Sequence, residues 1–136
     1  MIKNYNKKVE KYYWGESVCL IHKNGIAYIR ISFDDEEYPN EGYIAGFEVF
    51  NNDKKREIFQ ELLDIAEGIA TKYGRWGLYI DISHDDELVD WLKENDFEIK
   101  DSEDGEYSMC KFVERYEGLL KLRYKTNKTK LRLKAK

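Results

Sequence analysis

One stretch, residues 43 to 74, constrains the fold more than any other part of the sequence. It begins with the β-forming run YIAGFEVF and continues through a polar turn into REIFQELLDIAEGIATKYG. From Ile58 onward, apolar residues recur every three or four positions, which is the spacing of one helical face. Gly74 stands where a helix commonly ends in the left-handed conformation. The stretch therefore predicts a strand over 43–50 and a long helix over 53–73.

Three basic residues, Lys54, Lys55 and Arg56, open this predicted helix. A helix N-terminus already carries about half a positive charge, so cations there are mildly unfavourable. Cations beside unpaired backbone N–H groups suit an anion such as a phosphate. The alternative is a solvated basic turn, whose charge Asp53 and Glu57 offset. Both interpretations stay open from the sequence alone. The candidate caps of the helix are Asn51, Asn52 and Asp53.

The sequences on either side of this stretch predict more strands and a shorter helix. Asn24 followed by Gly25 indicates a two-residue hairpin turn. A strand, helix, strand order favours a crossover that places strands 43–50 and 76–83 side by side and parallel. Ser83 and Asp86 resemble a capping box for a helix that ends near Glu94. The other expected strands span 17–22, 25–33, 97–102 and 106–113, and the expected core face of the second is Ala27, Ile29, Ile31 and Phe33.

The length and composition indicate one globular domain. A chain of 136 residues with 42% apolar residues is long enough for a single core. Because no apolar run approaches 18 residues and no apolar signal segment opens the chain, we expect a cytoplasmic protein that does not enter a membrane. We expect one domain over 1–113, in which residues 1–16 are irregular, followed by a basic C-terminal extension over 114–136.

The cysteines and histidines predict no metal site. Cys19 and Cys110 follow neither a metal nor a redox spacing, so we expect two reduced cysteines. His22 and His84 each lack a second histidine at ligand spacing.

The C-terminal extension is the most basic part of the chain. Residues 119–136 hold eight of the 23 basic residues and none of the 27 acidic ones. Such a segment can contact nucleic-acid phosphates or the acidic surface of a partner, although the acidic remainder of the chain disfavours broad contact with nucleic acid. It can equally fold back on its own acidic body or stay a disordered end. The candidate contact residues are Lys121, Arg123, Tyr124, Lys125, Lys128, Lys130 and Arg132.

The order of predicted elements, together with two segments, resembles the GNAT superfamily of acetyl-CoA-dependent acyltransferases. The segments are GFEVF with the long helix ending in TKYG, and SHDDELVDWLKENDF, which is similar to the family's segment ending in Gly-Phe. The resemblance covers residues 17–113. It implies an α/β (α+β) fold with a GNAT-like mixed sheet, in which an antiparallel β-meander is followed by β-α-β-α-β-β and then by the basic C-terminal extension.

The resemblance also implies a cofactor, which is acetyl-CoA or a related acyl-CoA. In the family, a glycine-containing turn lets backbone N–H groups approach the pyrophosphate of the cofactor. The corresponding turn here contains no glycine, and its cations compensate for that only by charge. The implied cofactor-binding residues are Phe47, Val49, Lys54, Lys55, Arg56, Glu57, Ile58, Phe59 and Gln60.

For catalysis, the resemblance implies that Glu48 is the general base, and strand alternation places it on the face of Ile44, Gly46 and Phe50. The tyrosine with which the family often protonates the leaving thiolate falls on Leu92, or on Trp91 after a shift of one residue. Neither residue is an acid, and the candidate substitutes are Tyr79 and Tyr107.

The implied function is therefore an N-acyltransferase whose acceptor is a small-molecule or peptide amine. The family usually places a strand and two helices at the N-terminus, and only about 16 residues precede the first expected strand here. The alternative function is a catalytically inactive module of the same fold that binds a protein or a nucleic acid through its basic extension. The aromatic N-terminus and this extension are candidate contacts of a homo-oligomer.

Overall fold

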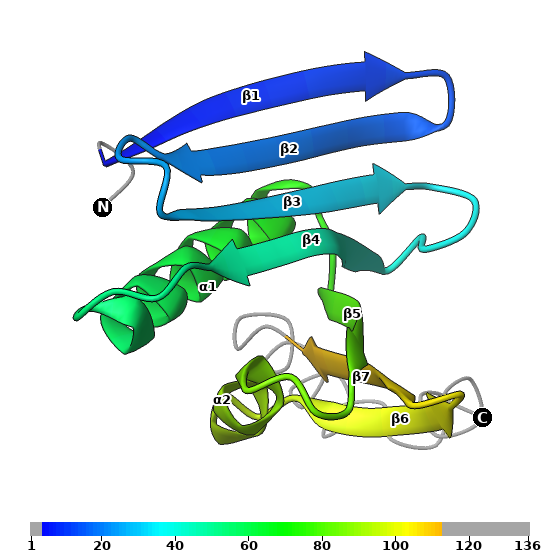
Figure 1. Cartoon of the computed structure of the whole chain (residues 1–136). Coiled ribbons are helices and arrows are strands. Elements are labelled where there is room, and N and C mark those ends of the chain that lie inside the picture. The colour runs from blue at the N-terminus through cyan, green and yellow to red at the C-terminus, as the bar shows by residue number, and fades with distance from the viewer. Residues whose placement is uncertain (1–3, 113–136) are drawn as a thin grey trace, which may run out of the picture.

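The computed structural model describes residues 4–112, which form a seven-stranded mixed sheet and two helices (Figure 1). The elements in chain order are β1 (Tyr5–Tyr12), β2 (Gly15–His22), β3 (Ala27–Asp34), β4 (Glu41–Val49), α1 (Lys55–Lys72), β5 (Gly77–Ser83), α2 (Leu88–Glu94), β6 (Glu98–Glu103) and β7 (Glu106–Phe112). No helix in this part of the chain is long and apolar enough to cross a membrane.

The sheet has the strand order β1-β2-β3-β4-β5-β7-β6. β4 and β5 are parallel, whereas the other neighbouring strands are antiparallel. This confirms the expected crossover, in which α1 connects two parallel strands. The meander before it and the closing hairpin of β6 and β7 are also confirmed.

The prediction of an irregular N-terminal segment is wrong, because residues 5–12 form strand β1. β1 pairs with β2 along its whole length, from Tyr5 opposite His22 to Tyr12 opposite Gly15. The strand lies at the edge of the sheet, and charged side chains are typical of edge strands because they discourage pairing with other chains. Because most side chains of β1 are charged or polar, its sequence lacks the apolar alternation that predicted the other strands.

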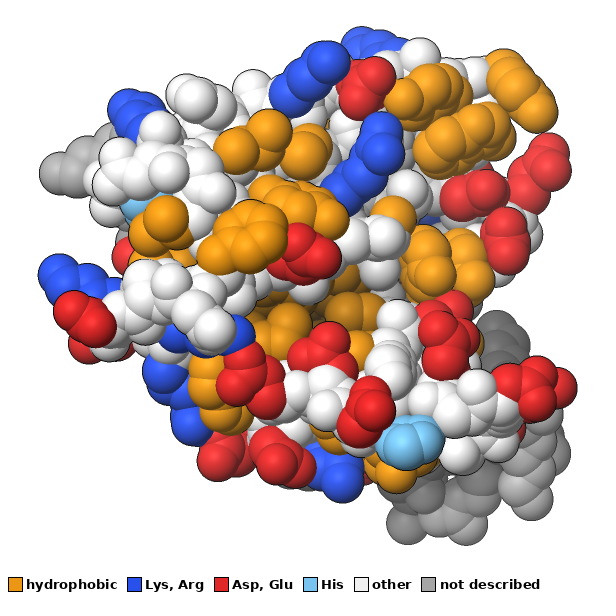
Figure 2. Space-filling model, in the orientation of Figure 1, with side chains coloured by type: hydrophobic (Ala, Val, Ile, Leu, Met, Phe, Trp, Pro, Cys, Tyr) orange, Lys and Arg blue, Asp and Glu red, His pale blue; other side chains and the backbone are white. Residues whose placement is uncertain are grey.

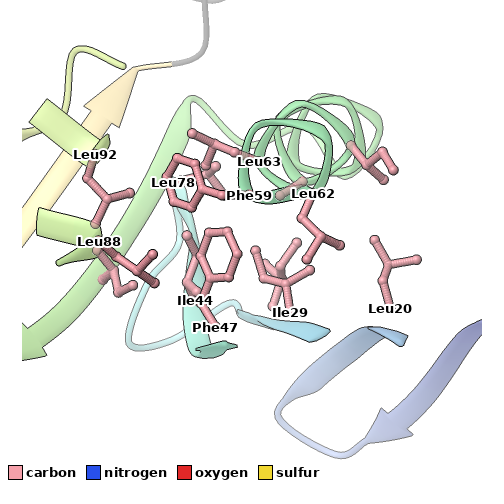
Figure 3. Packing of buried hydrophobic residues seen from close by; sticks show 14 of the residues in the cluster. Leu20, Ile29, Ile44, Phe47, Phe59, Leu62, Leu63, Leu78, Leu88 and Leu92 are labelled. Carbon is pink, nitrogen blue, oxygen red and sulfur yellow. The ribbon is translucent and has the colours of Figure 1, made fainter. Parts of the chain in front are cut away.

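The hydrophobic core lies between α1 and one face of the sheet, as Figure 3 shows. Phe59, Leu62 and Leu63 of α1 are fully buried against side chains of β2 to β5. The expected alternation in β3 is confirmed, since Ala27, Ile29, Ile31 and Phe33 are all buried. Burying one such aliphatic or aromatic side chain contributes about 1.5–3 kcal/mol, so this layer supplies most of the drive to fold.

The helix ends agree with the predictions in part. α1 ends with Gly74 at φ 72°, as expected for a left-handed cap. Its N-cap residue is Lys54, whose side chain makes no hydrogen bond to the first helical turn. A capping role for Asn51, Asn52 or Asp53 is therefore not observed. Asn52 instead accepts the N–H of Lys54 through Oδ1 at 2.8 Å and so forms the turn before the helix.

The predicted capping box of α2 is also wrong. The Oγ of Ser83 donates to Asp85, and Asp86 accepts the N–H of Leu88 at 2.9 Å. The helix starts only at Leu88, because residues 84–87 form the turn between β5 and α2. Its predicted end at Glu94 is confirmed, and Asn95 is the C-cap.

Both helices lie on the same face of the sheet. The buried residues of α2 belong to the same core cluster as those of α1, and Trp91 of α2 contacts Phe59 of α1 edge to face. Within residues 4–112, the opposite face of the sheet carries no helix. We call it the open face.

Candidate functional site

The most unusual feature of the sheet is the separation of β4 from β5. Residues 41–44 pair with residues 77–80, and the ladder then stops at Ile44 opposite Ile80. Beyond this rung, β4 continues to Val49 and β5 to Ser83 without pairing, and Figure 1 shows the two strands diverging. The divergence leaves one backbone edge of each strand facing a gap.

A β-bulge explains why the strands separate. Ile44 pairs with Ile31 and Gly46 with Arg30, so Ala45 has no partner in β3. An extra residue bends its strand and increases the local twist. The bend lies directly after the last rung shared with β5, where it carries the rest of β4 away.

Apolar side chains lie beside the gap. Phe47 of β4 and Ile82 of β5 are both buried on the helix-covered face. The ring of Phe47 stacks on Phe59 at 5.2 Å between centroids, and Phe59 contacts Trp91 at 5.3 Å. Figure 2 views the molecule from the open face and shows a hollow between the strands, with hydrophobic side chains at its base. A ligand entering the hollow would therefore meet an apolar floor and two free backbone edges.

The basic start of α1 lies close to α2. Lys55 forms an ion pair with Glu87, and Arg56 forms one with Glu94. The guanidinium of Arg56 also lies over the ring of Trp91, 5.0 Å from its centroid. Glu87, the N-cap residue of α2, and Glu94, its last residue, thus offset two of the three positive charges, rather than the expected Asp53 and Glu57. No ion pair of Lys54 is seen in the part of the chain that the structure describes.

Two backbone N–H groups remain unpaired at this helix start. The N–H of Lys55 donates to the carbonyl oxygen of Asn52 at 3.3 Å, and the next intrahelical bond runs from Ile58 to Lys54. Between them, the N–H groups of Arg56 and Glu57 have no acceptor within residues 4–112. Unpaired N–H groups at a helix N-terminus attract anions.

The other implied cofactor residues divide into core and surface. The side chains of Phe47, Val49 and Phe59 are buried, so only their backbone atoms are open to a ligand. Ile58 packs against the core from its margin. The side-chain amide of Gln60 donates to Asp64 and Asn95, both at 2.9 Å, and so links the two helices.

Glu48 is exposed, and the predicted alternation is correct for Gly46 but wrong for Ile44. Ile44 is buried beneath α1, whereas Glu48 lies on the open face opposite Tyr28 of β3. The bulge at Ala45 shifts the alternation by one residue, which places the two on opposite faces. Gly46 shares the face of Glu48, and the Tyr28 ring covers it so closely that a Cβ there would lie 3.1 Å from a ring carbon.

The candidate proton donors lie on different sides of the sheet. Tyr79 lies on the open face opposite Tyr43 of β4. Tyr107 is partly buried against the core on the helix-covered face, with its ring 6.1 Å from that of His84. The structure therefore brings only Tyr79 to the same face as Glu48.

Sequence reasoning missed Asp81, which follows the last rung of the ladder on the open face. It accepts hydrogen bonds from the hydroxyl of Tyr43 at 3.1 Å and from the hydroxyl of Ser108 at 2.7 Å. Its position could have been read from β5 itself, where the alternation of buried Leu78, Ile80 and Ile82 leaves Tyr79 and Asp81 on the other face.

The candidate contact residues of the C-terminal extension, Lys121 to Arg132, lie outside the described residues. Among residues 4–112, no three side chains of His, Cys, Asp or Glu converge as a metal site would require. The two cysteines are free.

No protein-family profile and no curated protein sequence match the chain. Solved structures do match. An aminoglycoside 6'-acetyltransferase type Ii superposes with a TM-score of 0.60 at 13% identity, over 74% of this chain and 70% of that one. The PaiA N-acetyltransferase from Thermoplasma acidophilum, in complex with coenzyme A, superposes with a TM-score of 0.59 at 16% identity, over 71% of this chain and 59% of that one.

A GNAT family acetyltransferase from Elizabethkingia anophelis with acetyl-CoA bound superposes with a TM-score of 0.57 at 12% identity, over 81% of this chain and 99% of that one. The chain thus has the GNAT fold.

Proposed function

We propose that this chain binds an acyl-coenzyme A between β4 and β5 and transfers its acyl group to an amine. The observation that carries the proposal is the end of the β4–β5 ladder at Ile44 and Ile80. It leaves a free backbone edge above an apolar floor, beside a helix start with two unpaired N–H groups. An extended molecule with amides at one end and phosphates at the other fits this arrangement.

The free edge of β4 suits the amide-containing arm of coenzyme A. Unpaired strand edges bind extended chains through backbone hydrogen bonds, as they would bind another strand. Residues 45–49 provide such an edge where β5 has diverged. The side chains of Phe47 and Val49 remain in the core and hold the edge in place.

The start of α1 suits the phosphates. The N–H groups of Arg56 and Glu57 and the unpaired ammonium of Lys54 provide donors and positive charge. The Arg56 ion pair is exposed on both sides, and exposed pairs contribute only about 0–1 kcal/mol. Arg56 can therefore exchange Glu94 for a phosphate at little cost. The absence of glycine from residues 51–57 limits how closely the backbone approaches the ligand.

We assign to Glu48 the role of accepting the proton of the attacking amine. It lies on the open face of β4 within the diverging segment, and within residues 4–112 it has no ion-pair partner. The thioester supplies an activated acyl group. An alkyl thiol has a pKa of about 8.5, so a thiolate is an adequate leaving group without a strong acid beside it. The presence of Trp91 and Leu92 in place of a tyrosine is consistent with transfer that is slower but still proceeds.

A thermal-shift titration with acetyl-CoA tests the proposal. Ligand at a hundredfold its Kd stabilises a protein by about 2.7 kcal/mol, which raises Tm by several degrees for a domain of this size. We expect the shift to be lost when Lys54, Lys55 and Arg56 are all replaced by alanine. Lys72→Ala, at the opposite end of the same helix, is the matched control and should keep the shift.

Glu48→Gln separates binding from transfer. It should leave the acetyl-CoA shift unchanged and lower the rate of acyl transfer by about 10²–10⁴, the usual contribution of a general base. No shift with millimolar acetyl-CoA in the unmodified chain would contradict the proposed function.

A further inference from the structure

Three tyrosines gather on the open face where the β4–β5 ladder ends. Tyr43 and Tyr79 face each other across the ladder, with 5.8 Å between ring centroids. Tyr38, from the loop before β4, stacks on Tyr43 at 4.8 Å and lies 5.4 Å from Tyr79. Each is half-buried, so part of each ring remains open to solvent. Together with Asp81, which follows Tyr79 by two residues, they form what we call the tyrosine–aspartate cluster.

Asp81 is held in a fixed orientation and lacks a counter-ion. Each of its oxygens accepts one hydroxyl, from Tyr43 at 3.1 Å and from Ser108 at 2.7 Å. No cation pairs with it in the described part of the chain, although acids elsewhere do find partners, such as Glu87 with Lys55. Neutral hydroxyls orient a carboxylate without neutralising it, and each carboxylate oxygen can accept a second hydrogen bond.

The surroundings of the cluster add negative charge. Residues 34–37 are four consecutive acids, and among them only Asp35 pairs with a cation, Arg75, within the described residues. Burial raises the pKa of Tyr43 to about 12, and the charge of Asp81 adds to the effect. The pKa of Tyr38 is also raised to about 12, first by burial and then by Glu37. At neutral pH the rings of Tyr38 and Tyr43 are therefore uncharged.

Aromatic ring faces beside an oriented carboxylate are a recognition site for an organic cation. A ring attracts an ammonium through its quadrupole by about 0.5–2 kcal/mol, and a carboxylate adds a charge-assisted hydrogen bond. Anions are repelled by the same groups. Building on the function proposed above, we propose that the tyrosine–aspartate cluster binds an ammonium group of the acyl acceptor.

The proposal also sets the class of acceptor. An amine attacks a thioester only after it has lost its proton, whereas the cluster stabilises the charged form of an amine, so we assign the attack to a second amino group of the acceptor. The acceptor must then carry at least two amino groups. Asp81 holds one as the cation, and Glu48, on the same face of the neighbouring strand, takes the proton of the other. The structure thus favours diamines or polyamines over acceptors with a single amine.

A titration of the full-length chain with 1,5-diaminopentane, followed by NMR chemical shifts, tests the proposal. We expect the largest shifts at β4, β5 and β7 around Asp81. Asp81→Asn should raise the Kd at least fivefold, because it removes the charge and keeps the shape. Glu103→Gln is the control, because it removes an exposed carboxylate from the edge strand β6. It should change the Kd less than twofold. A diol of the same length should not bind.

If Asp81→Asn and Glu103→Gln weakened diamine binding equally, the proposal would be overturned. The affinity would then depend only on the overall charge of the protein. Absence of binding would also overturn it. The acetyl-CoA shift of Asp81→Asn separates the two proposals. Acetyl-CoA binding without diamine binding leaves the proposed function standing, whereas an Asp81-dependent diamine site without acetyl-CoA binding contradicts the acyltransferase alone.

Discussion

At the residue scale, Arg75 fixes the acidic loop before β4. Its side chain is buried and donates to the carbonyl oxygens of Tyr38 at 2.9 Å and Pro39 at 2.7 Å. It also pairs with Asp35 and lies over the ring of Phe33, 5.6 Å from the centroid. One guanidinium thus ties the loop to the core and sets the position of Tyr38 beside Tyr43.

Arg75→Ala should therefore destabilise the fold by about 2–4 kcal/mol, because two part-buried hydrogen bonds from a charged donor to backbone carbonyl groups are lost. Asp35→Ala is the matched control. Its carboxylate is mostly exposed, so its loss should cost about 1 kcal/mol or less. Urea unfolding of both variants measures the difference. Equal effects would mean that the ion pair, rather than the carbonyl contacts, holds the loop.

At the scale of elements, the N-terminal hairpin depends on one glycine. Gly15 begins β2 directly after the turn from β1, with φ at 147°, and a Cβ there would lie only 1.9 Å from the carbonyl oxygen of Phe33. That conformation is essentially restricted to glycine. The close approach lets β2 pair with β1 and β3 at once, so the open face extends as far as β1.

Gly15→Ala should cost at least about 2 kcal/mol more than Gly25→Ala in urea unfolding. Gly25 also has a positive φ, 69°, but no atom lies within 4 Å of its would-be Cβ. Replacing Gly25 by alanine therefore costs only backbone strain at a positive φ. Replacing Gly15 costs strain as well and also forces β2 away from β3. Similar costs for the two variants would show that the close contact with Phe33 is relieved by a small shift.

At the scale of the whole molecule, three half-buried tyrosines make stability sensitive to alkaline pH. The pKa of Tyr73 is raised to about 12, mainly by burial and secondly by its hydrogen bond to Glu16. The pKa values of Tyr38 and Tyr43 are also raised to about 12. A folded-state pKa above the unfolded value of about 10 means that the folded state binds the proton more tightly. The stability contributed by these groups is complete below pH 10 and is lost as pH rises toward 12.

We therefore expect the free energy of unfolding to fall between pH 10 and 12, by at most about 1.4 kcal/mol per pH unit for each of these tyrosines. Urea unfolding across this range measures the slope. Tyr73→Phe should flatten it, whereas Tyr13→Phe, at a fully exposed tyrosine, should not. A slope unchanged by Tyr73→Phe would assign the loss of stability to other groups.

The sequence by itself determined the elements whose signals are local. The period of α1, the buried face of β3 and the β-α-β crossover were all predicted, because each depends on residues close together in the chain. The hairpin between β2 and β3 was also predicted, but its loop spans the four residues 23–26 instead of the two-residue Asn24-Gly25 turn, and only Gly25 has a positive φ. The order of these elements was enough to indicate the GNAT fold. The same information placed the start of α1 near a possible phosphate site, and that assignment stays a prediction.

Only the tertiary structure decided how distant residues meet. Residues 5–12 form strand β1 because they pair with the backbone of β2, although their own sequence is highly charged. The bulge at Ala45 exists only relative to β3, and it moves Glu48 to the face opposite Ile44. Lys55 pairs with Glu87 at the N-cap of α2, and Asp81 accepts hydrogen bonds from hydroxyls on two other strands. Pairing between strands and ion pairing between helices depend on contacts far apart in the chain, which local periodicity does not encode.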